Sequence, residues 1–306
     1  MIKILEHTPE IEELVINWHL TEVCNFRCQY CYSSWKNPNI KGELWRNDIQ
    51  SRRLLEYIYN FFAPSNLSNP LRASLRWHAV RLSLAGGEPT LLGGRLVDIA
   101  TEAKKLGFNV SLITNGSRPE TISDIAGYLD MLGISIDSAN QETNAYIGRA
   151  CRNRSPISAA DIISIVRRVR ACRHGIAIKI NTVVNALNAE EDMSAFILKA
   201  RPDRWKIMRM LPTVTEALSV GSGVFQSFVD RHHKLLQLIT VEHNSDMTQS
   251  YIMVDPYGRF FQNQSQMQGY QYSSQITRIG AEGAFLENKF CPTAFATRYS
   301  ASSQST

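Results

Sequence analysis

The sequence predicts an α/β protein, a partial (βα)6 TIM-like barrel with a C-terminal extension that closes the barrel mouth. Apolar runs of strand length alternate six times with helical patterns before residue 212. This order implies parallel strands joined by right-handed crossovers. Several strands alternate apolar and polar residues, which suits an open barrel with a polar interior. A length of 306 residues fits one barrel of this kind.

The six repeats follow in order along the chain. We expect strands at residues 14–20, 79–85, 109–115, 131–137, 176–184 and 203–211. We expect helices between them at residues 52–62, 94–107, 119–129, 159–173 and 189–200. Gly107 suits the end of the second helix, because glycine adopts a left-handed backbone at little cost. Functional residues should lie at the carboxyl ends of these strands.

The pattern changes after residue 211. Residues 212–223 are expected to form a loop, 225–239 a helix, and 249–255 with 258–263 a hairpin. We therefore divide the chain into a barrel core, residues 1–211, and an extension, residues 212–306. The tail from about residue 296 is expected to be disordered, because it ends in the small polar residues ASSQST.

Composition and charge limit the location and the partners. The sequence has no run of about 18 uncharged apolar residues that would span a membrane. Acidic residues interrupt the apolar N-terminal stretch, which argues against a signal peptide. The net charge of +5 is too small to indicate a nucleic-acid partner. We expect a cytoplasmic monomer that contacts neither membranes nor nucleic acid directly.

Three of the six cysteines lie close together, as Cys24, Cys28 and Cys31 in the spacing C-x3-C-x2-C. A structural zinc site needs four ligands, and no second cysteine pair follows. A 4Fe–4S cluster is usually held by four cysteines, so three would leave one iron open to a ligand. The spacing therefore favours a reactive cluster, with a structural metal site as the alternative. The scattered cysteines are interpreted as buried or unreactive thiols: Cys151, Cys172 and Cys291.

This spacing, with Tyr30 before the last cysteine, resembles the radical S-adenosylmethionine (SAM) superfamily. The resemblance implies that the open iron binds the amino and carboxylate groups of SAM, whose cleavage yields a 5′-deoxyadenosyl radical. The stretch AGGEP at residues 85–89 resembles the glycine-rich turn of that superfamily, although a tight turn between strand and helix would look the same. The cofactor residues that the resemblance implies are Gly86, Gly87, Glu88, Thr114, Asn115, Ser135 and Arg149.

These residues would contact different parts of the cofactor. Glu88 would pair with the ammonium of SAM, and Ser135 would contact its ribose. Arg149 would bind the carboxylate, because a guanidinium can donate two parallel hydrogen bonds to it. A surface arginine is the alternative for Arg149.

Longer stretches resemble viperin, an antiviral nucleotide-modifying enzyme, and its prokaryotic relatives. The likeness runs from about residue 17 to 261 and includes NWHLTEVCNFRCQYC, SIDSANQETNAYIGRA, IKINTVVNALNAEEDM, DRWKIMRML and QSYIMVDPYGRF. It implies conversion of a ribonucleoside triphosphate (CTP, UTP or GTP) to its 3′-deoxy-3′,4′-didehydro analogue. The adenosyl radical would remove the 4′ hydrogen, and the 3′ hydroxyl would leave as water. The extension would cover the nucleotide site.

Basic residues within apolar strands point to an anionic substrate. Burying a cation without a partner is costly, so several such residues in neighbouring strands suggest a shared anion. Any one of them could instead extend to a strand end. The resemblance places four at the triphosphate: Arg81, Lys179, Arg204 and Lys206. It adds three nucleotide contacts: Asn17, Asn181 and Tyr251.

The roles of Tyr251 and His19 have alternatives, and Ala85 departs from the family pattern. Tyr251 would supply the closing hydrogen atom or proton, although a tyrosine that opens a strand is more often a packing residue. His19 shares a strand face with Asn17, and a buried core histidine is the alternative to a role in the site. Ala85 stands where viperin commonly has serine, so one hydroxyl contact is missing.

Two other functions stay open. A radical SAM enzyme for a peptide or a cofactor precursor often has more C-terminal cysteines, whereas this chain has only Cys291 after residue 172. A non-catalytic iron–sulfur electron-transfer or binding protein would not need buried basic residues. For the nucleotide enzyme we expect a 4Fe–4S cluster, SAM and a ferredoxin or flavodoxin-type electron donor. Magnesium can accompany a triphosphate, but no residue indicates it.

Overall fold

The computed structural model describes residues 8–31, 40–151, 155–212, 215–263 and 269–300. The parallel strands are β1 (Glu10–Thr21), β2 (Arg76–Gly86), β3 (Asn109–Thr114), β4 (Met131–Ser135), β5 (Ala177–Val184), β6 (Arg204–Arg209) and β7 (Ile239–Glu242). The helices among them are α1 (Asp48–Phe62), α2 (Gly94–Leu106), α3 (Pro119–Ile125), α4 (Gln141–Ile147), α5 (Ala159–Cys172), α6 (Ser194–Ala200) and α7 (Ser222–Arg231). The C-terminal elements are β8 (Ile252–Val254), β9 (Arg259–Asn263), β10 (Tyr270–Gln275), α8 (Ile276–Leu286) and α9 (Pro292–Ser300).

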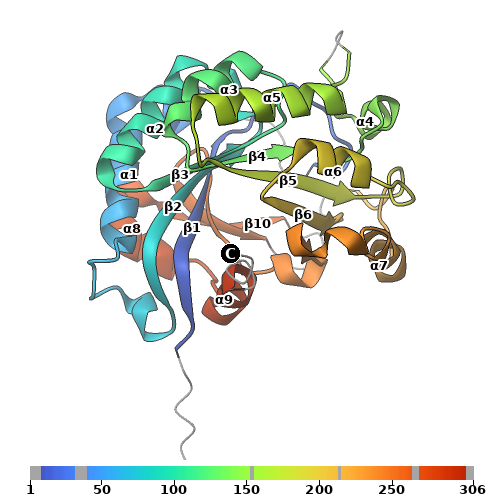
Figure 1. Cartoon of the computed structure of the whole chain (residues 1–306). Helices are drawn as coiled ribbons and strands as arrows, with labels where there is room; N and C mark the ends of the chain where they lie inside the picture. The colour runs from blue at the N-terminus through green and yellow to red at the C-terminus, as the bar shows by residue number, and fades with distance from the viewer. Residues whose placement is uncertain (1–7, 32–39, 152–154, 213–214, 264–268, 301–306) are drawn as a thin grey trace, which may run out of the picture.

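The predicted partial barrel is confirmed. Strands β1 to β6 pair in sequence order and in parallel, and each expected strand and helix of the six repeats has its counterpart. Figure 1 shows the sheet curving, with α1, α2, α3, α5 and α6 on its outer side. Gly107 ends α2 with a φ of 104°, as predicted.

The sheet is wider than the six predicted strands. The described strands form one ten-stranded sheet in the order β10-β9-β8-β1-β2-β3-β4-β5-β6-β7. The expected hairpin is confirmed as β8 and β9, and β8 pairs with β1. The helix expected at residues 225–239 is too long, because α7 ends at Arg231 and β7 begins at Ile239. Strands on both sides of residue 211 thus share one sheet, and the division of the chain there stays a prediction.

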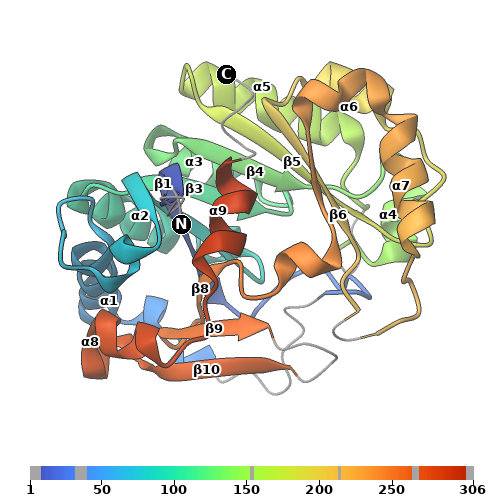
Figure 2. The ribbon, with the colours of Figure 1, turned by 90° about the horizontal axis from the view of Figure 1, so that it is seen from below.

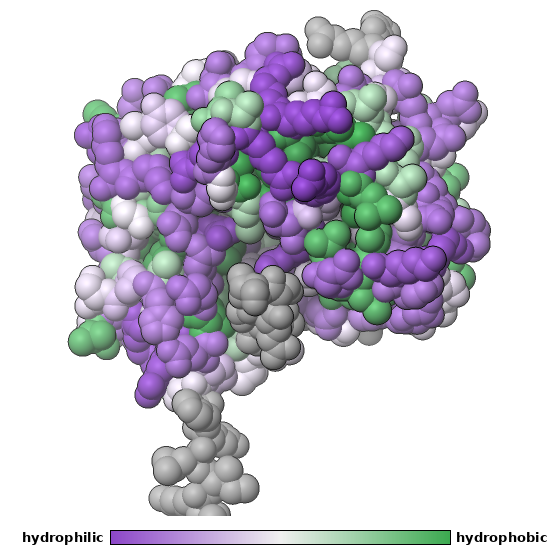
Figure 3. All heavy atoms as spheres, viewed as in Figure 1, coloured by the Kyte–Doolittle hydropathy of each residue, from purple (hydrophilic) through white to green (hydrophobic). Residues whose placement is uncertain are grey.

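Alternating side chains give the sheet an apolar outer face and a polar inner face. Leu14, Ile16 and Trp18 of β1 are fully buried in the core beneath the helices. Their neighbours Val15 and Asn17 face the opposite side, as the pleat requires. Polar residues cover most of the molecular face in Figure 3. No helix among the described residues is long and apolar enough to cross a membrane.

The expected disorder from about residue 296 is wrong for residues 296–300. These residues form the end of α9, whose Phe295 and Ala296 are buried. The Phe295 ring packs on Phe290 and Tyr299 at centroid distances of 5.3 and 4.5 Å. Figure 2 shows α9 between β1 and β6. Residues 301–306 lie outside the described part of the chain.

Candidate active site

The cysteine loop begins where β1 ends, at the carboxyl edge of the barrel. Glu43 holds its first residues: its carboxylate accepts hydrogen bonds from Thr21 Oγ1 at 3.0 Å and from the Glu22 amide at 2.8 Å. Glu43 is only 2% exposed. The entry to the loop is therefore fixed by a buried carboxylate.

Two glycines allow other segments to pack against this loop. Gly87 N donates to Thr21 O at 2.7 Å, and a Cβ on Gly87 would lie 2.1 Å from Val23 O. On the other side, Arg27 N donates to Gly148 O at 2.9 Å, and a Cβ on Gly148 would lie 2.1 Å from Arg27 O. The glycines of the GGEP stretch thus approach the cysteine loop itself. Their direct contact with a cofactor stays a prediction.

Cys24, Cys28 and Cys31 are half-buried in the loop. Burial raises the pKa of Cys24 and of Cys28 to about 11. Both are therefore protonated at neutral pH and must lose a proton to bind a metal. Among the described residues, no three His, Cys, Asp or Glu side chains converge as ligands of one metal ion. A 4Fe–4S cluster does not need that convergence, because each thiolate binds a different iron.

The end of β3 joins the cysteine loop through Glu88. This carboxylate is fully buried and accepts hydrogen bonds from Thr114 Oγ1 and the Asn115 amide at 2.7 Å each. Burial raises the pKa of Glu88. Asn115 Nδ2 in turn donates to Asn25 Oδ1 at 2.9 Å and lies 3.8 Å from Cys24 Sγ. The structure brings these predicted cofactor residues together, while pairing of Glu88 with the SAM ammonium stays a prediction.

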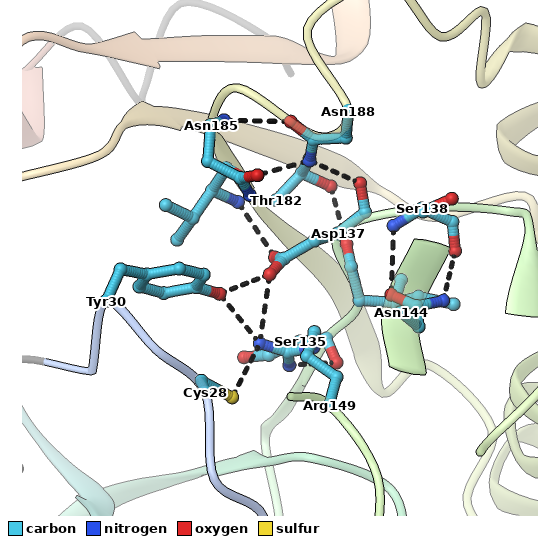
Figure 4. Close-up of polar contacts among 12 residues, drawn as sticks. Cys28, Tyr30, Ser135, Asp137, Ser138, Asn144, Arg149, Thr182, Asn185 and Asn188 are labelled. Atoms are coloured by element: carbon cyan, nitrogen blue, oxygen red, sulfur yellow. Dashed lines mark hydrogen bonds and ion pairs between the residues drawn. The ribbon is translucent and has the colours of Figure 1, made fainter. Parts of the chain in front are cut away.

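Arg149 follows α4 and lies in a buried polar network (Figure 4). Its Nη1 lies 3.0 Å from Tyr30 Oη and 3.3 Å from Asp137 Oδ2. Its Nη2 donates to Ser135 O at 2.6 Å. The side chain is 7% exposed, so the alternative of a surface arginine is wrong. Nε is buried and has no hydrogen-bond partner among the described residues, so it remains for a ligand.

The predicted phosphate residues lie on β2, β5 and β6 of the barrel. Lys179 of β5 pairs with Arg204 of β6, and two residues further Asn181 pairs with Lys206. Arg81 on β2 lies close enough to Lys179 and Arg204 to disfavour their charged forms. The structure therefore brings all four predicted cations into one region, as the sequence predicted.

Gly133 of β4 makes room for this group. A Cβ on Gly133 would lie 3.3 Å from Lys179 Cε, 3.4 Å from Asn181 Nδ2 and 2.5 Å from Ile113 Cδ1. A larger residue would push both polar side chains out of place. The sequence analysis did not single out this glycine, because the contact crosses between strands.

Two carboxylates offset part of the positive charge. Arg81 pairs with Glu13, and Lys206 Nζ lies 2.5 Å from Glu242 Oε1. Lys179 makes no ion pair with any residue that the structure describes. Burial and nearby cations hold the pKa of Lys179 well below its usual value, and burial lowers the pKa of Lys206 to about 8. Such a region favours an anionic ligand, because an anion would restore the charged forms.

Tyr251 precedes β8 and contacts the same group. Its hydroxyl donates to Glu242 Oε2 at 3.0 Å and lies 3.4 Å from Lys206 Nζ. Arg298 of α9 stacks on the Tyr251 ring at 3.5 Å and also bonds Glu242 and the Tyr251 hydroxyl. Burial raises the pKa of Tyr251 well above its usual value, so the phenol keeps its proton. Asn17 of β1 lies beside Tyr299 of α9.

His19 has the character of a core histidine. It is 2% exposed, and its ring packs edge-on against Phe261 at 5.1 Å. Burial lowers its pKa to about 4, so the ring is neutral at physiological pH. The sequence analysis left this interpretation open, and the packing favours it.

Several charged residues of the site were not predicted from the sequence, among them Glu13, Asp137, Glu242 and Arg298. Asp137 belongs to the SIDS stretch, which was noted only as a strand end. Glu242 and Arg298 carry no recognisable pattern, because each meets the site only through the tertiary fold.

These features fit the predicted cofactors and substrate. The three thiols of the cysteine loop can supply the iron ligands. The buried Nε of Arg149 suits a carboxylate, and Lys179, which makes no ion pair with a described residue, suits a phosphate. The chemistry of the available donors is thus right for a cluster, SAM and a polyanion.

Comparisons with known proteins agree with this chemistry. Residues 18–193 match the family described as the Radical SAM superfamily. The chain is 40% identical over 295 residues to the S-adenosylmethionine-dependent nucleotide dehydratase of Pseudoalteromonas ulvae, covering 96% of this chain and 95% of that protein. It is 39% identical over 290 residues to the protein of the same name from Psychrobacter lutiphocae, covering 94% and 95%.

A solved structure shares the fold. Native anSMEcpe with bound AdoMet and Cp18Cys peptide matches with a TM-score of 0.63 over 94% of this chain and 84% of that chain. The sequence identity is 15%, so this likeness shows the fold alone. The family match covers more than half of the chain, and both relatives match nearly all of it. The resemblance read from the sequence is therefore confirmed: the protein is an enzyme of the radical SAM superfamily and belongs to the viperin-like S-adenosylmethionine-dependent nucleotide dehydratases.

Proposed function

We propose that this enzyme converts CTP, UTP or GTP to the 3′-deoxy-3′,4′-didehydro analogue. The observation that carries the proposal is the group of partly buried cations on β2, β5 and β6, in which Lys179 makes no ion pair with any described residue. A peptide or an uncharged cofactor precursor would leave the excess positive charge of this group uncompensated. A triphosphate would compensate it.

The charges support a triphosphate in particular. Five cations meet here (Arg81, Lys179, Arg204, Lys206 and Arg298), and two carboxylates (Glu13 and Glu242) contact three of them. With all five cations charged, this region would carry a net charge of +3. A nucleoside triphosphate carries three to four negative charges, so it would nearly neutralise this region. Magnesium bound with the nucleotide stays a prediction.

The cofactor side of the site has its own residues. Family membership implies a 4Fe–4S cluster and SAM. Cys24, Cys28 and Cys31 would bind three irons of the cluster and leave the fourth iron to SAM. Cluster and cofactor together would supply the radical that takes the 4′ hydrogen. Arg149 would bind the SAM carboxylate through Nε, the atom that is free of partners in the described structure. Ser135 and Asn181 are paired across β4 and β5, so the predicted cofactor and nucleotide contacts are adjacent.

Tyr251 is suited to the closing step. Its phenol keeps its proton at neutral pH because burial raises its pKa. It also lies 3.4 Å from Lys206, which we place at the phosphates. A protonated phenol at this position can donate a hydrogen atom or proton to the ribose. Electron transfer from ferredoxin or flavodoxin stays a prediction.

The test is anaerobic reconstitution with dithionite and SAM, followed by each ribonucleotide separately. We expect 5′-deoxyadenosine and a nucleotide product lighter by one water with at least one triphosphate. Cys28→Ala should abolish SAM cleavage, whereas Cys172→Ala, at the exposed end of α5, should not. Absence of a dehydrated product with all four ribonucleotides, in protein that cleaves SAM, would sink the proposal.

A further inference from the structure

The network in Figure 4 is built around one carboxylate, that of Asp137. Asp137 is fully buried. Its Oδ1 accepts a hydrogen bond from the Val183 amide at 3.0 Å. Its Oδ2 accepts one from the Tyr30 hydroxyl and lies 3.3 Å from Arg149 Nη1. The Asp137 side chain, at the end of β4, therefore contacts three other segments: the cysteine loop through Tyr30, β5 through Val183, and the turn that follows α4 through Arg149.

The neighbouring loop fixes Asp137 in turn. Asn188 Nδ2 donates to Asp137 O at 2.7 Å, and the Asn185 amide donates to Asn188 Oδ1 at 2.8 Å. Thr182 Oγ1 donates to Ile136 O at 2.8 Å, directly before Asp137. Both carboxylate oxygens and the carbonyl oxygen of Asp137 therefore have hydrogen-bond partners, and a buried group satisfied in this way is held in one arrangement. Asp137 is thus a rigid support rather than a mobile side chain.

Arg149 connects Asp137 to the cysteine loop. Its Nη1 lies 3.9 Å from Cys28 Sγ and 3.0 Å from Tyr30 Oη. A buried guanidinium without its carboxylate is costly and would seek other partners. Asp137 and the Tyr30 hydroxyl therefore keep the positive charge beside a predicted iron ligand.

We propose that Asp137 is a positioning residue that, with the Tyr30 hydroxyl, fixes the Arg149 guanidinium beside Cys28 and leaves Nε available to the SAM carboxylate. The inference rests on the proposed function only in taking Cys28 as a cluster ligand. Groups behind the direct ligands commonly orient them and tune the metal centre. Two measurable quantities follow: the reduction potential of the cluster and the affinity for SAM.

The first test changes the charge. Asp137→Asn keeps the shape and removes one negative charge near Cys28, so the cluster should become easier to reduce. We expect a midpoint potential that is more positive than that of the wild type, measured by redox titration of the EPR signal. The matched control is Asp130→Asn, at the other end of β4, where Asp130 pairs with Arg173 and Lys104 at 2.8 and 2.9 Å. Its potential should equal that of the wild type.

The second test removes one hydroxyl. Tyr30→Phe keeps the ring and every charge but breaks the bonds to Asp137 and Arg149. The dissociation constant of SAM should rise about tenfold, because the guanidinium is no longer preorganised. Anaerobic calorimetry on protein of equal iron and sulfide content gives this constant. Tyr57→Phe, whose hydroxyl contacts only the exposed Arg53 among the described partners, is the control.

The outcomes separate clearly. A shifted potential in Asp137→Asn and weaker SAM binding in Tyr30→Phe support the proposal. An unchanged potential or an unchanged SAM affinity, in protein with full cluster content, overturns it. If Asp137→Asn does not fold or takes up no cluster, Tyr30→Phe alone decides. A wild-type protein that binds cluster and SAM but converts no nucleotide contradicts the proposed function and leaves this inference intact.

Discussion

The low pKa of Lys206 predicts that nucleotide binding takes up a proton at alkaline pH. Burial lowers this pKa from 10.5 to about 8 in the protein without nucleotide. At pH 8.5 the side chain is then about three quarters neutral. Contact with a triphosphate favours the ammonium form, so binding should bring about three quarters of a proton to Lys206. At pH 7 the same uptake should be about a tenth of a proton.

Calorimetry in two buffers of different ionisation enthalpy measures this uptake directly. At pH 8.5 the phosphates of the nucleotide are already ionised, so they contribute little. The matched variant is Lys206→Arg, because arginine keeps its charge at this pH. Uptake should fall in the variant by the share that Lys206 contributes, about three quarters of a proton. Equal uptake by the two proteins at pH 8.5 would refute the reasoning.

Three further predictions concern stability and access to the site. Lys179→Met should stabilise the protein without nucleotide by about 1 kcal/mol, because it removes an amine whose charged form burial and nearby cations disfavour. It should also weaken triphosphate binding tenfold or more. Thermal unfolding measures the stability and calorimetry the binding, and a destabilised variant contradicts the charge argument. The folded pKa of His19, about 4, lies below its ordinary value of 6.5, so its share of stability is complete above pH 6.5 and is lost as pH falls toward 4. His19→Gln should therefore flatten the fall in unfolding free energy by up to about 3 kcal/mol over that range, and an identical acid profile would count against it. Gly133→Ala should reduce triphosphate affinity, because its Cβ would meet Ile113 and Lys179. The control Gly127→Ala, whose Cβ meets nothing within 4 Å, should bind the triphosphate normally. Equal affinities would show that the barrel accommodates the methyl group at residue 133.

Most of the barrel could be predicted because its strands are long and bounded by polar or glycine-rich turns. Strand β7 could not, because Ile239–Glu242 is short and directly follows a helical segment. Helix α9 was missed for a different reason. Its small and polar residues give no strong apolar period, and its order comes from packing Phe295 into the core. Tertiary contacts of this kind leave no local pattern in the sequence.

Part of the site could be predicted from the sequence, and part of it could not. The cysteine spacing and the basic residues in apolar strands are local patterns with a direct physical meaning. The carboxylates that accompany them are not: Glu242 lies in a short strand, and Asp137 resembles an ordinary residue at a strand end. Both are identified only when the fold shows which cations they contact.

The carboxylates of Glu13 and Glu242 also explain how the protein without nucleotide tolerates so many partly buried cations. Glu13 and Glu242 are rigid partners on β1 and β7, the strands that flank the group. They neutralise some of the charge, but they leave Lys179 without an ion pair among the described residues. A fully neutralised region would bind a triphosphate only by breaking existing pairs, and a region without carboxylates would strongly destabilise the fold. The observed balance therefore keeps the barrel folded and still favours a polyanion, and Lys179 is where that preference should be strongest.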